Sequence, residues 1–374
     1  MTQVSGRDLQ TPLTVNERLL SRSIRHQVFV LGYASKEAAR IEKLLRLVQR
    51  DIEAQIIERL RRVQGRGYSL GPANSKRLRA LYTAVDEILT DEYSELYRQN
   101  RDELYGFVGR EADFERRLLQ TVVPIEVGTV LPPLEALRSA VVSRPFQGNT
   151  LRQWYGSLRD AQRQALRRSV NIGIVEGESI EEIVGRVVGT RGVQFRDGAL
   201  SLGRRQARAV VRTAVHATAT QARELLYQQN RSLIKGVQMV ATLDGRTTPY
   251  CRAIDGKVFD VDEGPRPPFH VNCRTTTVPI TRSLRELGIA DIGRYSPSTR
   301  ASMNGQVPAS LTYPNWFKQQ SGAFQREVLG ARRYRMYQAG LTNITRFADR
   351  EGRLYTLSEL YRRERDIAQA ANLV

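Results

Sequence analysis

Apolar residues recur at helical spacing along the first third of the chain. From Ser35 they fall three, four or seven positions apart, between lysine, arginine and glutamate side chains. This pattern predicts a long helix with Ser35 as its N-cap and with Gly65 and Gly67 at its end. A second amphipathic helix is predicted from about Ser75 to beyond Gln99.

Glycines and prolines punctuate the segments that follow. A Gly-Phe-Val-Gly run at 106–109 predicts a break, after which a shorter helix over 111–122 stops at Pro124. The stretch 130–145, which holds two adjacent prolines, is predicted to be a loop, and helical periodicity resumes over 150–174.

The next helix start is marked by Ser179, which stands three residues before Glu182 as in a capping box. A long helix is predicted over 204–229. The residue pattern then changes from helical to β-rich. Residues 237–243 are rich in β-forming residues and are followed by Asp-Gly turn signals. We therefore expect a compact β module over 236–283.

After this module, a polar connector over 296–310 precedes a helix over 315–338 and a last helix from Ser358. The fold class is therefore α+β and mostly α-helical, with long helices and a small β-rich Cys/His module near the C-terminal third. We interpret the chain as five regions: a flexible N-terminal arm (1–30), a helical domain (31–135), a basic helical region (136–235), the β-rich Cys/His module (236–283), and a C-terminal connector with helices (284–374).

Composition adds a strong charge imbalance to this picture. The 374 residues carry 58 Lys and Arg against 39 Asp and Glu, a formal net charge of +19. An excess of this size implies a polyanionic partner or a polyanion-rich compartment. Neither a secretory signal nor an apolar run of membrane-spanning length is visible, so we expect a soluble protein of a reducing cytosol with no membrane partner.

Basic residues strongly outnumber acidic ones over 185–235, where ten stand against two. Arg204, Arg208 and Arg212 fall four apart on one helical face, and Arg205 lies beside them. These four arginines are candidates for non-specific contacts with the DNA backbone. The alternative is a face that pairs with acidic groups of a partner protein.

Both cysteines and one of the three histidines lie within 23 residues. Cys251, His270 and Cys273 are a usable ligand set for a structural zinc ion, since thiolates and imidazole suit that metal. Asp244 is a candidate fourth ligand, and water is another. Thr248 stands where a Cys-x-x-Cys pair would place its first cysteine.

Three other interpretations of the cysteines remain open. They are consistent with buried, reduced packing residues, with a disulfide that staples the module, and with a catalytic metal or a nucleophilic Cys-His pair. Asp255-Gly256 favours a turn over a catalytic base. Of the other histidines, His216 is interpreted as a packed or surface residue of its helix and not as a ligand, and no motif surrounds His26 in the arm.

The module contains an ordered set of residues: Asp244-x-Arg246-Thr247, Cys251, Asp255-Gly256, and Pro268-x-His270-x-x-Cys273-Arg274. This run resembles the signature of the Mu F-like phage minor head (head morphogenesis) proteins. It departs from that signature at Thr248 and Thr275, where the family often carries cysteines. The preceding helix, with Arg212-Thr213-Ala214, is also similar, and the resemblance covers about 150–374.

The resemblance implies a virion component of a tailed bacteriophage. Such a protein is present in few copies near the portal inside the head, is made in the host cytoplasm, and contributes to head assembly, DNA packaging or genome delivery. The implied partners are the portal protein, the major capsid protein or scaffold, and packaged double-stranded DNA bound non-specifically. Proteins of this kind are not generally enzymes.

Two other classes compete with this assignment. The first is a metal-dependent, nuclease-like enzyme that processes DNA with the Cys/His module. The second is a chromatin-like protein that coats DNA. A packaging motor is excluded, because no glycine pair is followed by the Lys-Ser/Thr of a phosphate-binding loop.

Overall fold

The computed structural model divides the chain into two compact units, each built from segments distant in the sequence. The first, here called the module unit, comprises residues up to 30, 110–133 and 219 onward. The second, the helical unit, comprises 31–109 and 134–218. The structure describes residues 14–64, 72–123, 128–193, 195, 197–283, 286–287, 299–349 and 353–373.

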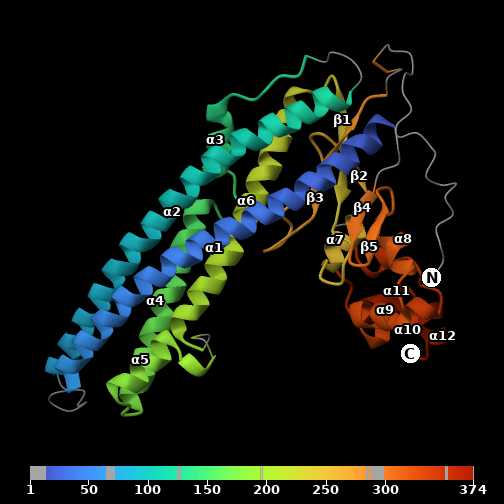
Figure 1. Cartoon of the computed structure of the whole chain (residues 1–374). Coiled ribbons are helices and arrows are strands. Elements are labelled where there is room, and N and C mark those ends of the chain that lie inside the picture. Colours follow the sequence, from blue (N-terminus) through green and yellow to red (C-terminus); the bar gives the residue numbers. More distant parts are fainter. Residues whose placement is uncertain are drawn as a thin grey trace. The chain divides into compact units, whose positions relative to one another are not determined.

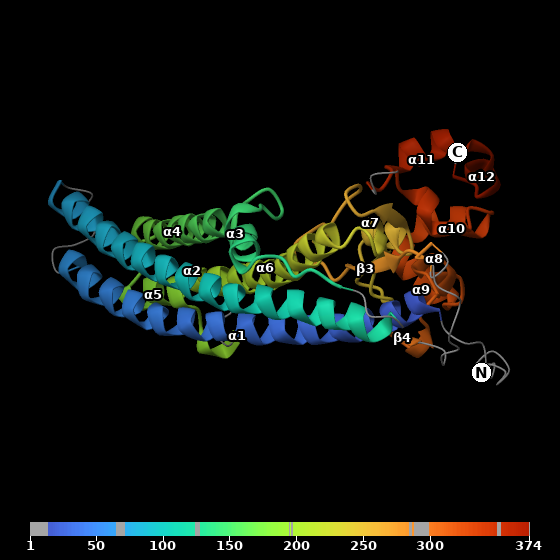
Figure 2. The ribbon, with the colours of Figure 1, turned by 90° about the horizontal axis from the view of Figure 1, so that it is seen from above.

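Long helices running side by side build the helical unit (Figures 1 and 2). The helices that contribute to it are α1 (Val15–Gln64), α2 (Pro72–Val122), α3 (Leu134–Ser143), α4 (Leu151–Val175), α5 (Ile180–Val188), a 3₁₀ turn (Arg191–Val193) and α6 (Ala199–Gln229). The predicted apolar stripe of α1 is buried, as Ile41 and Ile52 show. Tyr33 of α1 stacks on Phe107 of α2, with ring centroids 4.4 Å apart.

The start of α1 corrects the predicted arm. Residues 15–30 are helical, and Leu19 and Leu20 are buried in an apolar cluster of the module unit. Burial of these leucines favours the helix over a solvated arm. Ser35 lies inside α1, where its Oγ donates to the carbonyl of Leu31 at 2.9 Å, so it is not the N-cap. The rest of the arm, like Gly65 and Gly67, lies outside the described residues.

Two further boundaries differ from the sequence prediction. The predicted break at 106–109 is wrong, since α2 is continuous through it. Phe107 and Val108 are fully buried there, and their burial offsets the low helix propensity of the flanking glycines, about 1 kcal/mol each. The predicted loop over 130–145 contains α3, which buries Val141 and neighbouring residues. Pro124 lies outside the described residues.

Local capping signals are confirmed. Ser179 and Glu182 form the predicted capping box of α5, in which the Ser179 backbone N–H donates to the Glu182 carboxylate at 2.7 Å. The helix predicted over 150–174 is α4, capped in the same way by Thr150. The helix predicted over 204–229 is α6, which begins at Ala199.

The module unit contains a three-stranded antiparallel sheet in the order β2-β1-β3. Its strands are β1 (Ile234–Val240), β2 (Val258–Asp260) and β3 (Thr276–Thr281), and a separate hairpin pairs β4 (Thr299–Ser302) with β5 (Gly305–Pro308). Val237 of β1 and Val278 of β3 pack on the cluster that holds Leu19. The predicted fold class, mostly helical α+β with a small β module, is confirmed.

Short helices close the chain (Figure 1). The helix predicted over 315–338 is three helices, because Gly330 adopts φ 75° between the second and the third. The elements are α8 (Tyr313–Lys318), α9 (Gly322–Leu329), α10 (Ala331–Gln338), a 3₁₀ turn (Ile344–Phe347), α11 (Leu357–Arg363) and α12 (Arg365–Ala370). Trp316 and Phe317 are fully buried in their shared core. None of the described helices is long and apolar enough to cross a membrane.

Gly236 lets β1 approach β2 closely. A Cβ at this position would lie 2.6 Å from the carbonyl oxygen of Phe259. Gly236→Ala is therefore expected to lower the free energy of unfolding by about 1–3 kcal/mol, measured by urea denaturation. Gly32→Ala is the matched control, because its Cβ meets nothing within 4 Å on an exposed helix face, and it should stabilise by about 0.5–1 kcal/mol. Equal effects of the two changes would contradict the close approach.

Candidate metal centre

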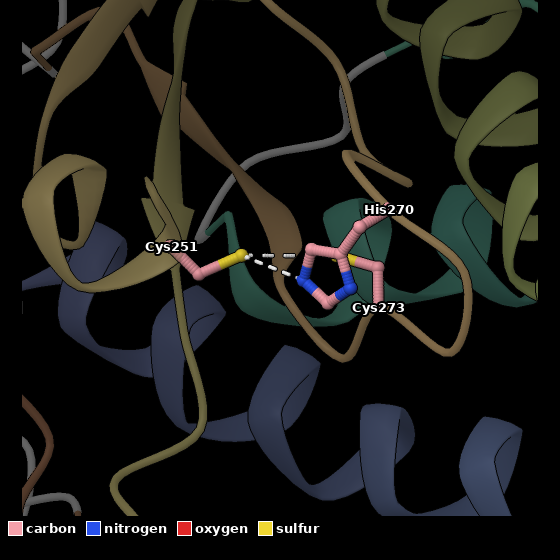
Figure 3. Close-up of side chains that lie close together, drawn as sticks. All are labelled: Cys251, His270 and Cys273. Atoms are coloured by element: carbon pink, nitrogen blue, oxygen red, sulfur yellow. Dashed lines mark hydrogen bonds between the residues drawn. The ribbon is translucent and has the colours of Figure 1, made fainter. Parts of the chain in front are cut away.

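Two elements of the module bring the cysteines together. Cys251 lies on α7 (Pro249–Ile254), a short helix that follows β1 and begins with a proline at its first position. His270 and Cys273 lie in the loop between β2 and β3, where the Cys273 N–H donates to the His270 carbonyl at 3.1 Å. This turn holds the two loop side chains on one side, facing Cys251 (Figure 3).

The three donor atoms form a compact triangle. The Cys251 sulfur lies 3.4 Å from His270 Nε2 and 3.9 Å from the Cys273 sulfur, and all three atoms lie within 4.8 Å of one another. Tetrahedral zinc with Zn–S bonds of about 2.3 Å separates two sulfur ligands by about 3.8 Å. The triangle therefore fits a zinc ion. Both cysteines are free thiols, which does not match the disulfide interpretation.

The histidine is oriented for ligation. His270 Nδ1 lies 3.0 Å from the carbonyl oxygen of Val271, so the Nδ1–H tautomer leaves the Nε2 lone pair facing Cys251. The hydrogen bond with Cys273 and burial raise the pKa of the Cys251 thiol. The hydrogen bond to Cys273 likewise raises the pKa of His270. Zinc bound here would displace protons from the thiols, because thiolates are the ligand form.

Asp244 is not part of the triangle, which corrects the predicted ligand set. Its carboxylate accepts two hydrogen bonds from Arg274, at 2.6 and 2.8 Å, and others from the backbone N–H groups of Arg246 and Thr247. This bidentate pairing satisfies the carboxylate and draws it away from the sulfurs. Asp244 instead fixes the loop that carries Cys273.

The fourth position around the triangle is small and polar. A cavity of about 20 Å³ is lined by Cys251, His270, Thr248 and Thr275, among others. This volume is sufficient for one water molecule, which needs roughly 10–15 Å³. If zinc were bound, three protein ligands and one water would complete a tetrahedral set.

A second carboxylate, Asp255, joins the module to the C-terminal helices. Its oxygens accept the backbone N–H groups of Ala241 at 2.5 Å and Tyr313 at 2.6 Å. The Arg300 guanidinium lies 3.3 Å from both oxygens, and the side chains of both residues are buried. The turn predicted at Asp255-Gly256 is present, with Gly256 at φ 82°. The sequence did not predict these contacts of Asp255, because only the fold brings it to Arg300 and Tyr313, which lie 45 and 58 positions away.

Acid is expected to weaken the Asp244–Arg274 pair. Burial opposes the charged carboxylate, but the hydrogen bonds and charge of Arg274 outweigh it and lower the pKa of Asp244. The stability that the ionised carboxylate contributes is fully present above its unfolded pKa of about 3.9. This contribution is lost as pH falls through its lower folded pKa. Asp244→Asn should therefore cost about 1–2 kcal/mol at pH 7 and less near pH 2.5. Urea titrations of both proteins at the two pH values test this. A pH-independent difference would contradict it.

Two arginines of the predicted DNA-facing stripe, Arg204 and Arg208, are engaged within the helical unit. Arg208 forms an ion pair with Glu42 of α1 at 2.9 Å. Arg204 donates to Gln49 of α1 and to a loop carbonyl. Arg205 is exposed and donates to the hydroxyl of Ser201, and Arg212 is half-buried. Arg204 and Arg208 therefore face α1, a contact between residues more than 150 positions apart that periodicity alone does not reveal.

A buried charged cluster links α1, α2 and α6 in the module unit. The guanidinium of Arg223 lies 2.9 Å from the Glu115 carboxylate, which also accepts the Tyr227 hydroxyl at 2.9 Å. Glu111 lies 3.8 Å from Arg223 and accepts from His26 at 2.9 Å. His26 was thus not recognised as a structural residue. The third histidine, His216, is buried in α6, which agrees with the packed one of its two predicted positions, packed or surface.

These features define a class of protein: a mostly helical protein with a compact Cys/His module suited to one zinc ion. Residues 164–278 match the family model described as "Phage Mu protein F like protein". The match spans the end of α4 through the metal triangle to β3, so the resemblance to Mu F-like head morphogenesis proteins is confirmed over this segment. No curated protein and no solved structure matches the chain. The match supports a bacteriophage protein of head morphogenesis.

Proposed function

We propose that the protein is a low-copy component of the head of a tailed bacteriophage, located near the portal inside the capsid. It would contribute to head assembly, DNA packaging or genome delivery by binding and positioning, without bond chemistry. The observation that carries this proposal is the match over 164–278, which includes both the Cys/His module and its supporting helix α6.

The metal triangle has a structural role in this proposal. Zinc held by Cys251, His270 and Cys273 would tie α7 to the loop before β3. The cavity beside the triangle, about 20 Å³, has room for one water. Both cysteines are buried, which supports a structural clip, whereas the nuclease-like alternative would need a substrate to reach the fourth position, since a catalytic zinc keeps that position open.

The proposed partners are the portal protein, the major capsid protein or scaffold, and packaged double-stranded DNA. The net charge of +19 supports non-specific attraction to DNA. Arg205, which lies beside the predicted stripe and is exposed, remains a candidate contact, whereas Arg208 would first have to leave Glu42.

Co-expression with the portal and coat proteins of the same phage tests this proposal. We expect the chain to co-purify with the portal and to leave circular plasmid intact in the presence of zinc. Failure to associate with any head protein would contradict the placement. Plasmid nicking that disappears in His270→Ala would instead support the nuclease-like enzyme.

A further inference from the structure

An open groove of about 470 Å³ lies between α1 and α2 in the module unit. It is far from the metal triangle in sequence, and neither the proposed metal role nor the DNA role uses it. The side chains that line it include Arg22, Arg25, His26, Phe114, Arg117 and Leu118. Its floor is apolar and aromatic, and its rim carries three arginines.

The aromatic side chains that form the floor of the groove are held in place by contacts with one another and with Glu111. The His26 ring stacks on Phe114 with centroids 3.5 Å apart, and His26 Nε2 lies 2.9 Å from the buried carboxylate of Glu111. Phe29, one turn further along α1, stacks against His26 and is 58% exposed. An apolar side chain entering the groove would therefore meet a preformed aromatic surface, which lowers the entropic cost of binding.

The rim has more positive charge than the protein itself neutralises. Arg117 pairs with Asp113 at 2.6 Å. Arg22 and Arg25 are exposed, and among the described residues neither has an acidic partner. Arginine and aromatic side chains around an apolar centre are the typical composition of a protein-binding hot spot.

We infer that this groove docks an acidic amphipathic segment of another head protein. An apolar side chain of that segment would rest on Phe114 and Leu118, and its Asp or Glu residues would pair with Arg22 and Arg25. A second copy of this chain is a poor occupant, because two chains of net charge +19 repel each other. Duplex DNA matches the rim but has no apolar group to fill the floor. The inference rests on the proposed function, from which it takes the head protein as partner.

Two fluorescent 18-residue peptides provide the probe for the full-length protein. Both carry leucine on one helical face, and the other positions are mainly glutamate in one peptide and lysine in the other. We expect fluorescence anisotropy to show binding of the glutamate peptide only. The double variant Arg22→Glu/Arg25→Glu should weaken binding at least tenfold. Binding of both peptides, or of neither, would overturn the inference.

Two controls separate the groove from general charge attraction. Arg326→Glu/Arg332→Glu makes the same change in net charge on exposed positions of α9 and α10 and should alter affinity less than twofold. Thr121→Trp adds no charge but fills the groove, which Thr121 also lines, and should weaken binding at least tenfold. Circular dichroism verifies that each variant is folded. Equal losses in both double variants, or unchanged binding by Thr121→Trp, would overturn the inference.

A 20-base-pair duplex serves as competitor. If it displaces the peptide and its own binding is lost in Arg22→Glu/Arg25→Glu but not in Arg326→Glu/Arg332→Glu, the groove binds DNA and the inference is wrong. Co-purification with the portal keeps the two proposals distinguishable. If the peptide does not bind but portal association persists, only the groove inference fails. If the chain associates with no head protein, the proposed function fails.

Discussion

Replacing Arg223 by methionine is expected to lower the free energy of unfolding by about 3–5 kcal/mol. Arg223 is 2% exposed, and its guanidinium lies beside the equally buried carboxylates of Glu115 and Glu111. Burial raises the pKa of Glu115, and the charge of Arg223 opposes that rise. Without Arg223, the buried carboxylates of Glu115 and Glu111 would lose the cation that compensates them. Leaving a buried charge without its partner is strongly destabilising.

Arg208→Met is the matched control, because it makes the same change on the same helix. Arg208 is 41% exposed, and its pair with Glu42 should contribute no more than about 1 kcal/mol. Arg208 and Arg223 lie in different units, so urea denaturation is followed by far-ultraviolet circular dichroism, which reports on the helices of both units. Equal destabilisation by Arg223→Met and Arg208→Met would contradict the buried cluster as a stabilising element.

Loss of a sulfur ligand is the second large effect that we expect. Cys251→Ser should weaken zinc binding more than about 100-fold, since even changes to residues that only orient a ligand cost 10–100-fold. Thr248→Cys should have the opposite effect, because Thr248 lines the fourth position and a thiolate would complete a Cys₃His set. Competition with a chromophoric chelator measures both affinities.

His216→Ala is the control for a general effect of losing a potential ligand. His216 is buried in α6 and lies outside the triangle, so zinc affinity should stay within twofold. If Cys251→Ser bound zinc as tightly as the unchanged protein, the triangle would not be the metal site. If Thr248→Cys left the affinity unchanged, the fourth position would lie elsewhere.

Local signals predicted much of the secondary structure. The capping box of Ser179 depends on residues three positions apart, and the change to β-rich sequence at Gly236 depends on neighbouring residues, so both could be recognised before folding. The predicted break at 106–109 was wrong because burial of Phe107 outweighs the glycine propensities. Ser35 was a plausible cap only while the residues before it were taken to be an arm.

The candidate site was predicted only where its residues lie close together in the sequence, because long-range contacts leave no local pattern. Cys251 and Cys273 were conspicuous, because a chain with only two cysteines places them 22 residues apart beside a histidine. Asp244 was a reasonable fourth ligand until the fold placed Arg274 against its carboxylate. The Arg223 cluster joins residues 108 positions apart, and no local pattern indicates such a pair.

An asymmetric reconstruction of the phage head around its unique vertex tests the central claim most directly. We expect density that accommodates the sheet β2-β1-β3 and the metal triangle, at the portal and in fewer copies than the coat protein. Heads that lack this polypeptide, or that carry it evenly over the coat lattice, would contradict the claim.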